Sequence, residues 1–181
     1  MYRPARVRLQ DCDPDWPVRY EQEARLLTAA LRGRLLAIEH VGSTAIDGMP
    51  AKPIIDILVT VPVGYPGFGE VVDRLDRLGY VYTPEAEADD PGRRVFRKGP
   101  ADMTLPRTHH LHVTEAGSHY GRRLVAFRDH LRCHPADAAA YLALKRELAE
   151  RWADRSRDYT AGKRAFVAAI ELRAGVRPPA S

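Results

Sequence analysis

The longest apolar stretch of the chain, residues 53–63, is interrupted only by Asp56 and Thr60. Its first nine residues are apolar on both faces of an extended chain, which is typical of a strand inside a sheet that is covered on both sides. A membrane-spanning helix needs roughly 20 apolar residues, so this stretch is far too short to cross a bilayer. The pattern therefore predicts a buried strand over residues 53–61 and excludes a membrane protein.

Shorter patterns on either side of this strand predict a sheet flanked by helices. Alternating or apolar runs indicate further strands at residues 35–41, 80–82, 94–98 and 108–114. Apolar residues at helical spacing indicate helices over about residues 16–31, 67–79, 119–132, 136–153 and 157–174. We expect Asp15 to cap the first helix and Pro17 to lie in its first turn. The order of these elements predicts an α+β fold, a mixed β-sheet with flanking helices and a helical C-terminal third.

Length and composition suit one compact soluble domain, because 45% of the 181 residues are hydrophobic and 29% are charged. A chain of this size buries roughly 70% of its unfolded surface, so it needs no metal or disulfide for stability. We expect a single domain over residues 1–181, with a sheet core at about 16–118 and a helical region at about 119–174. The two cysteines form no CxxC motif and we find no secretory signal, so a cytoplasmic protein is expected.

The overall charge favours an anionic small-molecule ligand over a nucleic acid. Lys and Arg number 28 and Asp and Glu number 24, which gives a formal net charge of +4 with His neutral. Such a mildly basic chain lacks the concentrated positive charge of a protein that coats nucleic acid. The charge does not predict the oligomeric state.

Residues 40–45, which read His-Val-Gly-Ser-Thr-Ala, suit phosphate binding. A strand that ends in Gly-Ser before a short turn presents free backbone N–H groups and a hydroxyl, which are the groups that hold a triphosphate. Gly42, Ser43 and Thr44 are therefore candidate phosphate-binding residues, and Lys52 would add a positive charge. The alternative is that Gly42 and Ser43 only end the strand and cap a short helix.

Asp56 is a carboxylate within an otherwise apolar strand. An unpaired carboxylate there costs several kcal/mol unless a cation, a metal or a hydrogen-bond donor meets it. Asp56 is therefore a candidate for metal or substrate contact, and the alternative is an ion pair with Lys52 or a C-terminal arginine.

These features resemble the polymerase-β-like nucleotidyltransferase superfamily, in which a Gly-Ser turn and a strand bearing Asp-x-Asp form the metal and triphosphate site. A wider set of motifs resembles the GrpB-like family, which occurs as single-domain bacterial proteins and as a C-terminal extension of some dephospho-CoA kinases. The resemblance runs from about residue 11 to about residue 170. It is carried by residues 13–17, 40–45, 52–59, 110–113, 127–132 and 141–148, and by Tyr159, Thr160 and Lys163.

The resemblance implies a nucleotidyltransferase-like fold, but the metal ligands depart from the superfamily pattern. A second carboxylate normally lies two residues after the first, on the same face of the strand, and here that position is Leu58. The strand expected to carry a third carboxylate has His110 and His112 instead. One carboxylate and two imidazoles suit Zn or Mn better than Mg. The candidate catalytic and metal-binding residues are therefore Asp56, His110 and His112, with Mg, Mn or Zn as the candidate ion, whereas His109 faces the other way and is expected to be solvated.

Cations on the C-terminal helices are further candidates for ligand binding. Arg128 and Arg132 are one helical turn apart, and Lys145 and Lys163 recur on the next two predicted helices. If these helices pack beside Ser43, the four side chains form a basic wall that suits phosphates or a carboxylate. The family resemblance adds Tyr159 to this group. The alternative is that these charges lie on solvated helix faces.

Three functional hypotheses follow from the sequence. The first is a nucleotidyltransferase-like protein that binds a nucleoside triphosphate or another phosphorylated small molecule and transfers a nucleotidyl group with the help of a metal. The second is a non-catalytic ligand-binding or accessory module of the same fold. The third is a transferase or ligase cleft that uses no nucleotide. In the first, we expect the strand with Asp56 to lie at the centre of the sheet beside the strand with His110 and His112, all three facing one cleft.

Overall fold

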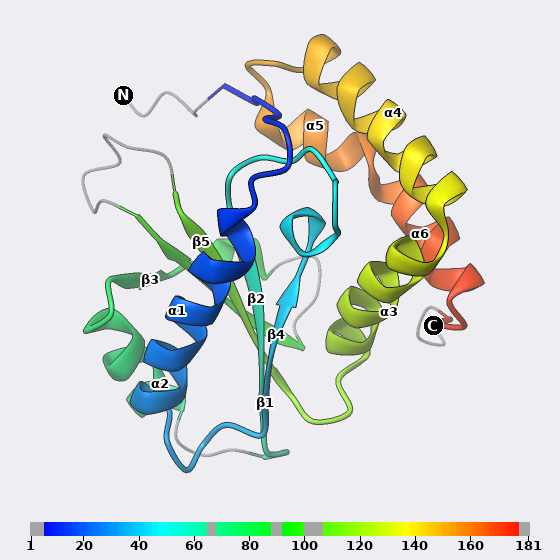
Figure 1. The fold of residues 1–181 in the computed structure, drawn as a ribbon. Coiled ribbons are helices and arrows are strands. Elements are labelled where there is room, and N and C mark those ends of the chain that lie inside the picture. Colours follow the sequence, from blue (N-terminus) through cyan, green and yellow to red (C-terminus); the bar gives the residue numbers. More distant parts are fainter. Residues whose placement is uncertain (1–5, 65–67, 88–91, 100–106, 178–181) are drawn as a thin grey trace.

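The computed structural model describes residues 6–64, 68–87, 92–99 and 107–177, and it forms one five-stranded mixed sheet with helices on both sides (Figure 1). The strands run in the spatial order β1 (Ala37–Val41), β2 (Ile55–Val61), β5 (His109–Glu115), β4 (Arg93–Lys98) and β3 (Tyr80–Tyr82). Strands β2 and β5 are parallel and the other neighbours are antiparallel. The mixed α/β fold expected from the sequence is confirmed, and β2 lies inside the sheet next to β5, which occupies the centre.

One face of the sheet forms the main hydrophobic core. Alternate residues of the central strands, such as Ile57 and Leu111, pack here against α1 (Asp15–Ala30) and α2 (Phe68–Asp76). Trp16 and Leu27 of α1 are fully buried in this core. Because successive side chains of a strand alternate between faces, the intervening residues of β2 and β5 point to the opposite face. That second face carries the candidate site.

Four helices make up the C-terminal part of the fold, and Figure 1 shows them grouped on the side of the sheet away from α1 and α2. They are α3 (His119–Cys133), α4 (Pro135–Arg151), α5 (Ser156–Gly162) and α6 (Arg164–Arg173). The single helix expected over 157–174 is wrong, because the helix is interrupted at Gly162 and Lys163 and the segment forms two helices. Glycine weakens a helix, and a Cβ at Gly162 would lie 2.5 Å from the side chain of Leu148 on α4. The absence of a Cβ at Gly162 therefore lets the end of α5 approach Leu148 of α4 closely.

Two local expectations need correction. Asp15 begins α1, but it is the side chain of Asp13 that accepts the backbone N–H of Asp15, at 2.9 Å. His109 is not solvated, because its side chain is only 13% exposed and lies 4.0 Å from buried Glu23, which pairs with Lys98 at 2.8 Å. An ion pair between α1 and β4 thus encloses the histidine that the alternation of the strand turns away from the candidate site.

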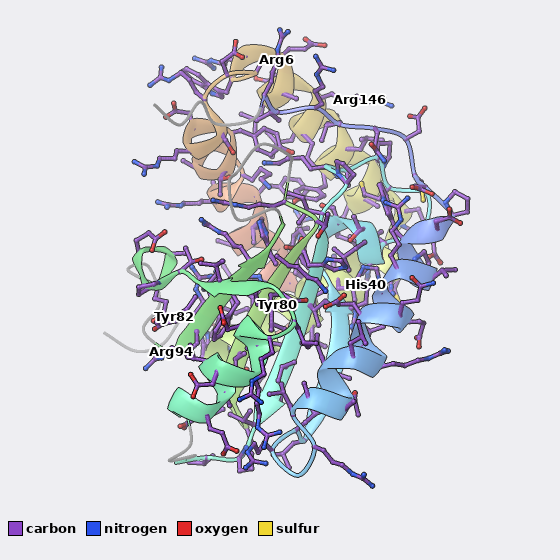
Figure 2. All side chains as sticks on the ribbon, turned by 90° about the vertical axis from the view of Figure 1, so that its left-hand side faces the viewer. Arg6, His40, Tyr80, Tyr82, Arg94 and Arg146 are labelled. Atoms are coloured by element: carbon purple, nitrogen blue, oxygen red, sulfur yellow. The ribbon has the colours of Figure 1, made fainter. Side chains whose placement is uncertain are left out.

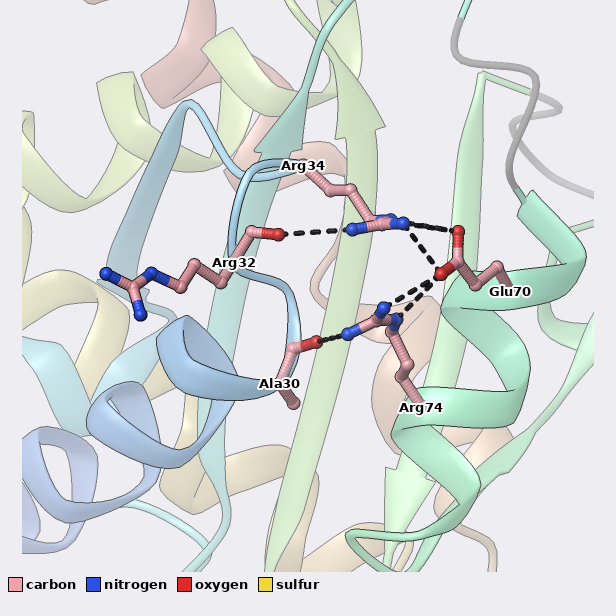
Figure 3. Close-up of polar contacts among 5 residues, drawn as sticks. All are labelled: Ala30, Arg32, Arg34, Glu70 and Arg74. Carbon is pink, nitrogen blue, oxygen red and sulfur yellow. Dashed lines mark hydrogen bonds and ion pairs between the residues drawn. The ribbon is translucent and has the colours of Figure 1, made fainter.

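Helices α1 and α2 are joined at one end by an exposed polar network (Figure 3). The carboxylate of Glu70 accepts hydrogen bonds from Arg34 at 2.6 Å and from Arg74 at 2.8 Å. Arg74 also donates to the carbonyl of Ala30 at the end of α1, and Arg34 donates to the carbonyl of Arg32. Carbonyl groups at the C-terminal end of a helix lack hydrogen-bond donors within the helix, and Arg74 provides a donor for one of these carbonyls. The network fixes where α1 ends relative to α2.

His40 joins strand β1 to helix α1, and Figure 2 shows it beside that helix. Its ring stacks on Tyr20 with the ring centroids 4.7 Å apart, and its Nε2 lies 3.0 Å from the Thr44 hydroxyl. Because that hydroxyl itself donates to the carbonyl of Ile54, Nε2 carries the proton and donates to Thr44. Burial lowers the pKa of His40 from 6.5 to about 4, and the nearby Asp56 opposes this shift only in part. The folded protein therefore holds His40 neutral.

We expect acid to destabilise the fold partly through His40. Between about pH 6.5 and pH 4 the unfolded chain binds a proton that folded His40 does not, so the free energy of unfolding falls as the pH falls through this window. The variant His40→Phe keeps a ring against Tyr20 but removes the titration, so its unfolding free energy should depend less steeply on pH. Urea unfolding across the window measures this, with exposed His134→Phe as the control. Equal slopes for His40→Phe and wild type would contradict the assignment.

Candidate functional site

The second face of the sheet contains a pocket of about 230 Å³ beside the N-terminal ends of β2 and β5. Its walls come from the turn after β1, the segment before β2, the two strands, and helices α4 and α5 with the residue that joins α5 to α6. Eight of the residues predicted from the sequence line it together: Ser43, Thr44, Lys52, Asp56, His110, Lys145, Tyr159 and Lys163. The other lining residues are Ala51, Ile54 and Thr160.

The register of β2 against β5 creates the centre of the site. Asp56 is the direct partner of His110 in the parallel ladder, so both side chains project from the same face. The Nδ1 atom of His110 lies 3.1 Å from Oδ1 of Asp56. Burial acts to raise the pKa of Asp56, but this hydrogen bond and the neighbouring histidine and lysine charges outweigh it, so the pKa is lowered. Asp56 is therefore a carboxylate, and His110 donates to it through Nδ1.

Gly42 does not line the pocket, but its backbone makes room for Asp56. It has a φ of +72°, and a Cβ there would lie 2.4 Å from Oδ2 of Asp56. A side chain at this position would be strained and would displace the carboxylate. Ser43–Ala45 then form a single 3-10 turn, and the Thr44 hydroxyl is taken up by His40 and Ile54. The Gly-Ser turn thus places the carboxylate as well as forming one wall of the pocket.

Three lysines bring positive charge to the same small space. The Nζ atoms of Lys52 and Lys163 lie 4.6 and 4.7 Å from the centroid of the Tyr159 ring, within the range of cation-π attraction. Lys145 is 1% exposed, donates from Nζ to the carbonyl of Pro50, and lies 4.9 Å from the Tyr141 ring centroid. Lysine is rarely buried so completely, so this arrangement favours a function for the charge.

Burial of these lysines disfavours their charged form. Loss of water around the ammonium group, and then repulsion from Lys163, lowers the pKa of Lys145 to about 7. The same two causes lower the pKa of Lys52 to about 8, against the attraction of Asp56. The pKa of Lys163 is also lowered, mainly by burial, and Asp56 counteracts the shift. Whenever more than one of the three lysines is protonated, the pocket has more positive charge than its single carboxylate balances.

His112 is on the expected face, but it does not line the pocket. Its position in β5 pairs with Leu58, and its Nδ1 lies 3.4 Å from the hydroxyl of Tyr120, which in turn accepts a hydrogen bond from Arg93. Burial lowers the pKa of His112 to about 4. In the part of the chain that the structure describes, no three His, Cys, Asp or Glu side chains cluster as metal ligands. The three predicted ligands thus do not converge, because the ring of His112 meets Tyr120.

Arg128, the first member of the predicted basic wall, is a structural anchor. Its side chain is 10% exposed and donates from Nη1 to Glu39 and to the carbonyl of His40, each at 2.9 Å. Its Nε donates to Asp129 at 2.7 Å. These bonds tie α3 to strand β1, and Arg128 does not line the pocket.

Arg132 also lies outside the pocket lining. Its Nε donates to the carbonyl of Ala45 at 2.9 Å, which fixes the turn after β1 against α3. The predicted wall is therefore divided: the two arginines hold the scaffold, and Lys145 and Lys163 reach the pocket. This division has a chemical reason, since the planar guanidinium group satisfies carbonyl and carboxylate oxygens at fixed angles.

Residues that sequence reasoning did not select also shape the site. Thr160 lines the pocket, and Tyr141 is buried beside it, where burial raises the pKa of its hydroxyl to about 12 and the neighbouring Ser43 opposes the shift. Gly162 allows the close packing that positions Lys163. Both Tyr141 and Thr160 stand within the family-like motifs, so their signal was present, but neither has a spacing that indicates a role by itself.

The residues at the pocket do not fit a divalent metal well. One oxygen of Asp56 receives the His110 hydrogen bond, the other packs against Gly42, and Leu58 is 2% exposed where a second carboxylate would stand. Lysine ammonium groups have no lone pair for a metal and repel it. The donor set suits an anion instead.

Comparison with known proteins agrees with the resemblance found in the sequence. A sequence model described as GrpB protein matches residues 6–173. A UPF0157 protein of Pseudomonas aeruginosa is 41% identical over 93% of this chain and 68% of its own length. The crystal structure of conserved protein GrpB from Enterococcus faecalis is 36% identical and superposes with a TM-score of 0.82, covering 92% of this chain and 96% of that one.

A longer relative carries a different name. A dephospho-CoA kinase of Mycolicibacterium paratuberculosis is 32% identical over 81% of this chain, and the match spans 40% of the kinase. The matched region is therefore less than half of that enzyme.

No helix in the described parts of the present chain is long and apolar enough to cross a membrane.

The two arginines of α3 should differ in their effect on stability. Arg128→Ala removes the partner of Glu39 and of a buried carbonyl, and we expect it to lower the free energy of unfolding by roughly 2–4 kcal/mol, less than for a fully buried pair because Glu39 is 36% exposed. Arg132 is 41% exposed, so Arg132→Ala should cost about 1 kcal/mol or less. Urea denaturation measures both. Similar small losses would place Arg128 on a solvated face.

Proposed function

The chain belongs to the GrpB family, and from the charge and geometry of its pocket we propose that it binds the phosphate group of a phosphorylated small molecule. The observation that carries the proposal is the gathering of Lys52, Lys145 and Lys163 around one carboxylate in a small, largely buried space. Protonated lysines there lack the water that would normally stabilise them, so a bound anion would replace it.

The charge of a phosphate group suits this pocket better than that of a carboxylate. With all three lysines protonated and Asp56 ionised, the lining residues carry two positive charges in excess. A phosphate monoester carries about −1.5 to −2 charges at neutral pH, whereas a carboxylate carries only one. Its several oxygen acceptors also match ammonium groups that arrive from three different segments of the chain.

The volume of the pocket limits what it holds. At about 230 Å³ it is smaller than the roughly 300–1,000 Å³ of pockets that enclose a whole drug-sized ligand. The pocket therefore suits one phosphate group and the atoms next to it, and the rest of the molecule would extend beyond it. This favours a phosphorylated metabolite over a fully enclosed nucleoside triphosphate.

The same binding serves an accessory role or a reaction. The match to part of a dephospho-CoA kinase favours the accessory role, since a domain of this family there forms part of a longer protein named for a different chemistry. A catalytic role would use the Asp56–His110 pair, in which the carboxylate orients an imidazole whose Nε2 is buried without a hydrogen-bond partner and would accept a proton only from a group that reaches it. Phosphate binding is common to both roles and is tested first.

We expect inorganic phosphate to raise the thermal unfolding midpoint more than chloride or acetate at equal ionic strength, because a ligand that binds only the folded state stabilises it. Lys163→Met should weaken phosphate binding by roughly 10- to 100-fold, the range for one charge-assisted hydrogen bond. Arg146→Met is the matched control, since Arg146 is an exposed cation next to Lys145 that does not line the pocket. Figure 2 shows Arg146 at the end of the molecule, near Arg6. Equal effects of the two variants, or equal shifts with all three anions, would refute the proposal.

Phosphate binding should also depend on pH. The pKa of Lys145 is about 7 and that of Lys52 about 8, so both lysines lose protons as the pH rises from 7 to 9 and the affinity for phosphate should fall. Isothermal titration calorimetry with inorganic phosphate measures this directly. Because bound phosphate favours the ammonium forms, binding near pH 8 should take up protons, seen as a heat that depends on the buffer. Affinity that rises steadily with pH would contradict the role of the lysines.

A further inference from the structure

We infer that the pocket holds its phosphate group without a divalent cation, with the ammonium groups of Lys52 and Lys163 supplying the positive charge beside Asp56. The inference rests on the proposed phosphate binding, and it departs from the metal-dependent chemistry that the sequence resemblance implies. It follows from how the carboxylate, its neighbours and the lysines are arranged.

Both oxygens of the Asp56 carboxylate already have neighbours in the protein. Oδ1 lies 3.1 Å from Nδ1 of His110, in a hydrogen bond set by the direct pairing of the two residues across β2 and β5. Oδ2 lies 2.4 Å from where a Cβ of Gly42 would stand, so the turn after β1 limits the space on one side of an oxygen whose side chain is 28% exposed. Mg²⁺ demands near-ideal octahedral geometry from oxygen ligands, and Asp56 is the single carboxylate among the residues that line the pocket.

The positions that would supply further metal ligands are used for other purposes. Leu58, two residues after Asp56 on the same face, is 2% exposed and lies under α3, where its side chain approaches Gly121. A carboxylate in its place would be buried under that helix. His112 pairs with Leu58 in the ladder and directs its ring toward Tyr120. Neither position offers a ligand to a metal at Asp56.

Lysines stand where a cation is needed. Lys163 lies close enough to Asp56 to lower the pKa of the carboxylate, and Asp56 in turn favours the charged forms of Lys52 and Lys163. Tyr159 holds both ammonium groups within 5 Å of its ring centroid. A divalent cation at this point would meet two like charges at short range in a poorly solvated pocket, where repulsion is strong. A phosphate group, which is negatively charged, would be attracted by the same two ammonium groups.

Calorimetric titration of the purified chain with inorganic phosphate tests the inference, first with EDTA present and then with MgCl2 or MnCl2. We expect the dissociation constant for phosphate to change by less than about twofold between these conditions. We also expect Mn²⁺ alone to give the paramagnetic resonance spectrum of the free ion when the protein is present. Phosphate binding that requires Mg²⁺ or Mn²⁺ would overturn the inference and leave the proposed function standing.

Absence of phosphate binding under every condition would instead overturn the proposed function, and this inference with it. The variant Lys163→Met adds a second test. It should bind phosphate at least about 10-fold more weakly, and Mg²⁺ should not restore the affinity, because Asp56 alone does not hold the ion. Restoration by Mg²⁺ would show that Asp56 accepts a metal once the ammonium group is gone, and would overturn the inference. Thermal unfolding of Lys163→Met and Arg146→Met establishes that both variants are folded.

Discussion

The pairing of Asp56 with His110 across the two parallel strands is the contact on which the site depends. A carboxylate on an interior strand is costly to desolvate, and this one persists because its partners come from three separate parts of the chain. The parallel register supplies His110, the turn after β1 supplies a glycine that leaves space for the second oxygen, and the junction of α5 and α6 brings Lys163. Each of these three features offsets a different part of the free-energy cost of desolvating the carboxylate.

The lysines of the pocket are buried or half-buried, although lysine side chains are usually exposed to solvent. Lys145 is almost completely enclosed, and its charge is opposed by the loss of water and by Lys163. The carbonyl oxygen of Pro50 and the face of the Tyr141 ring offset only part of that penalty. A bound anion would favour the protonated forms of these lysines, as the proposed phosphate binding requires. Preorganised charge of this kind favours anion binding because the protein does not have to rearrange when the ligand arrives.

The arginines and the lysines of the C-terminal part make different kinds of contact. Arg128 and Arg132 reach back to the carbonyls of His40 and Ala45, and so fix β1 and its turn against α3. Lys145 and Lys163 line the pocket together with Ser43 and Thr44 of that turn. The geometry of the guanidinium group suits fixed backbone oxygens, and the compact ammonium group suits a mobile ligand. The arginines that hold the turn in place thus come from α3, and the lysines that line the pocket come from α4 and from the junction of α5 and α6.

The sequence by itself determined the features that follow from local periodicity. Alternation along β2 and β5 placed Asp56, His110 and His112 on one face, and apolar spacing located the helices, apart from the break at Gly162. Tertiary structure alone decided that His112 turns to Tyr120, that the arginines serve the scaffold, and that three lysines converge. Arg128 meets a carbonyl 88 residues away and Lys145 one 95 residues away. Such contacts depend on how whole helices pack on the sheet, which a pattern of 2 or 3.6 residues does not encode.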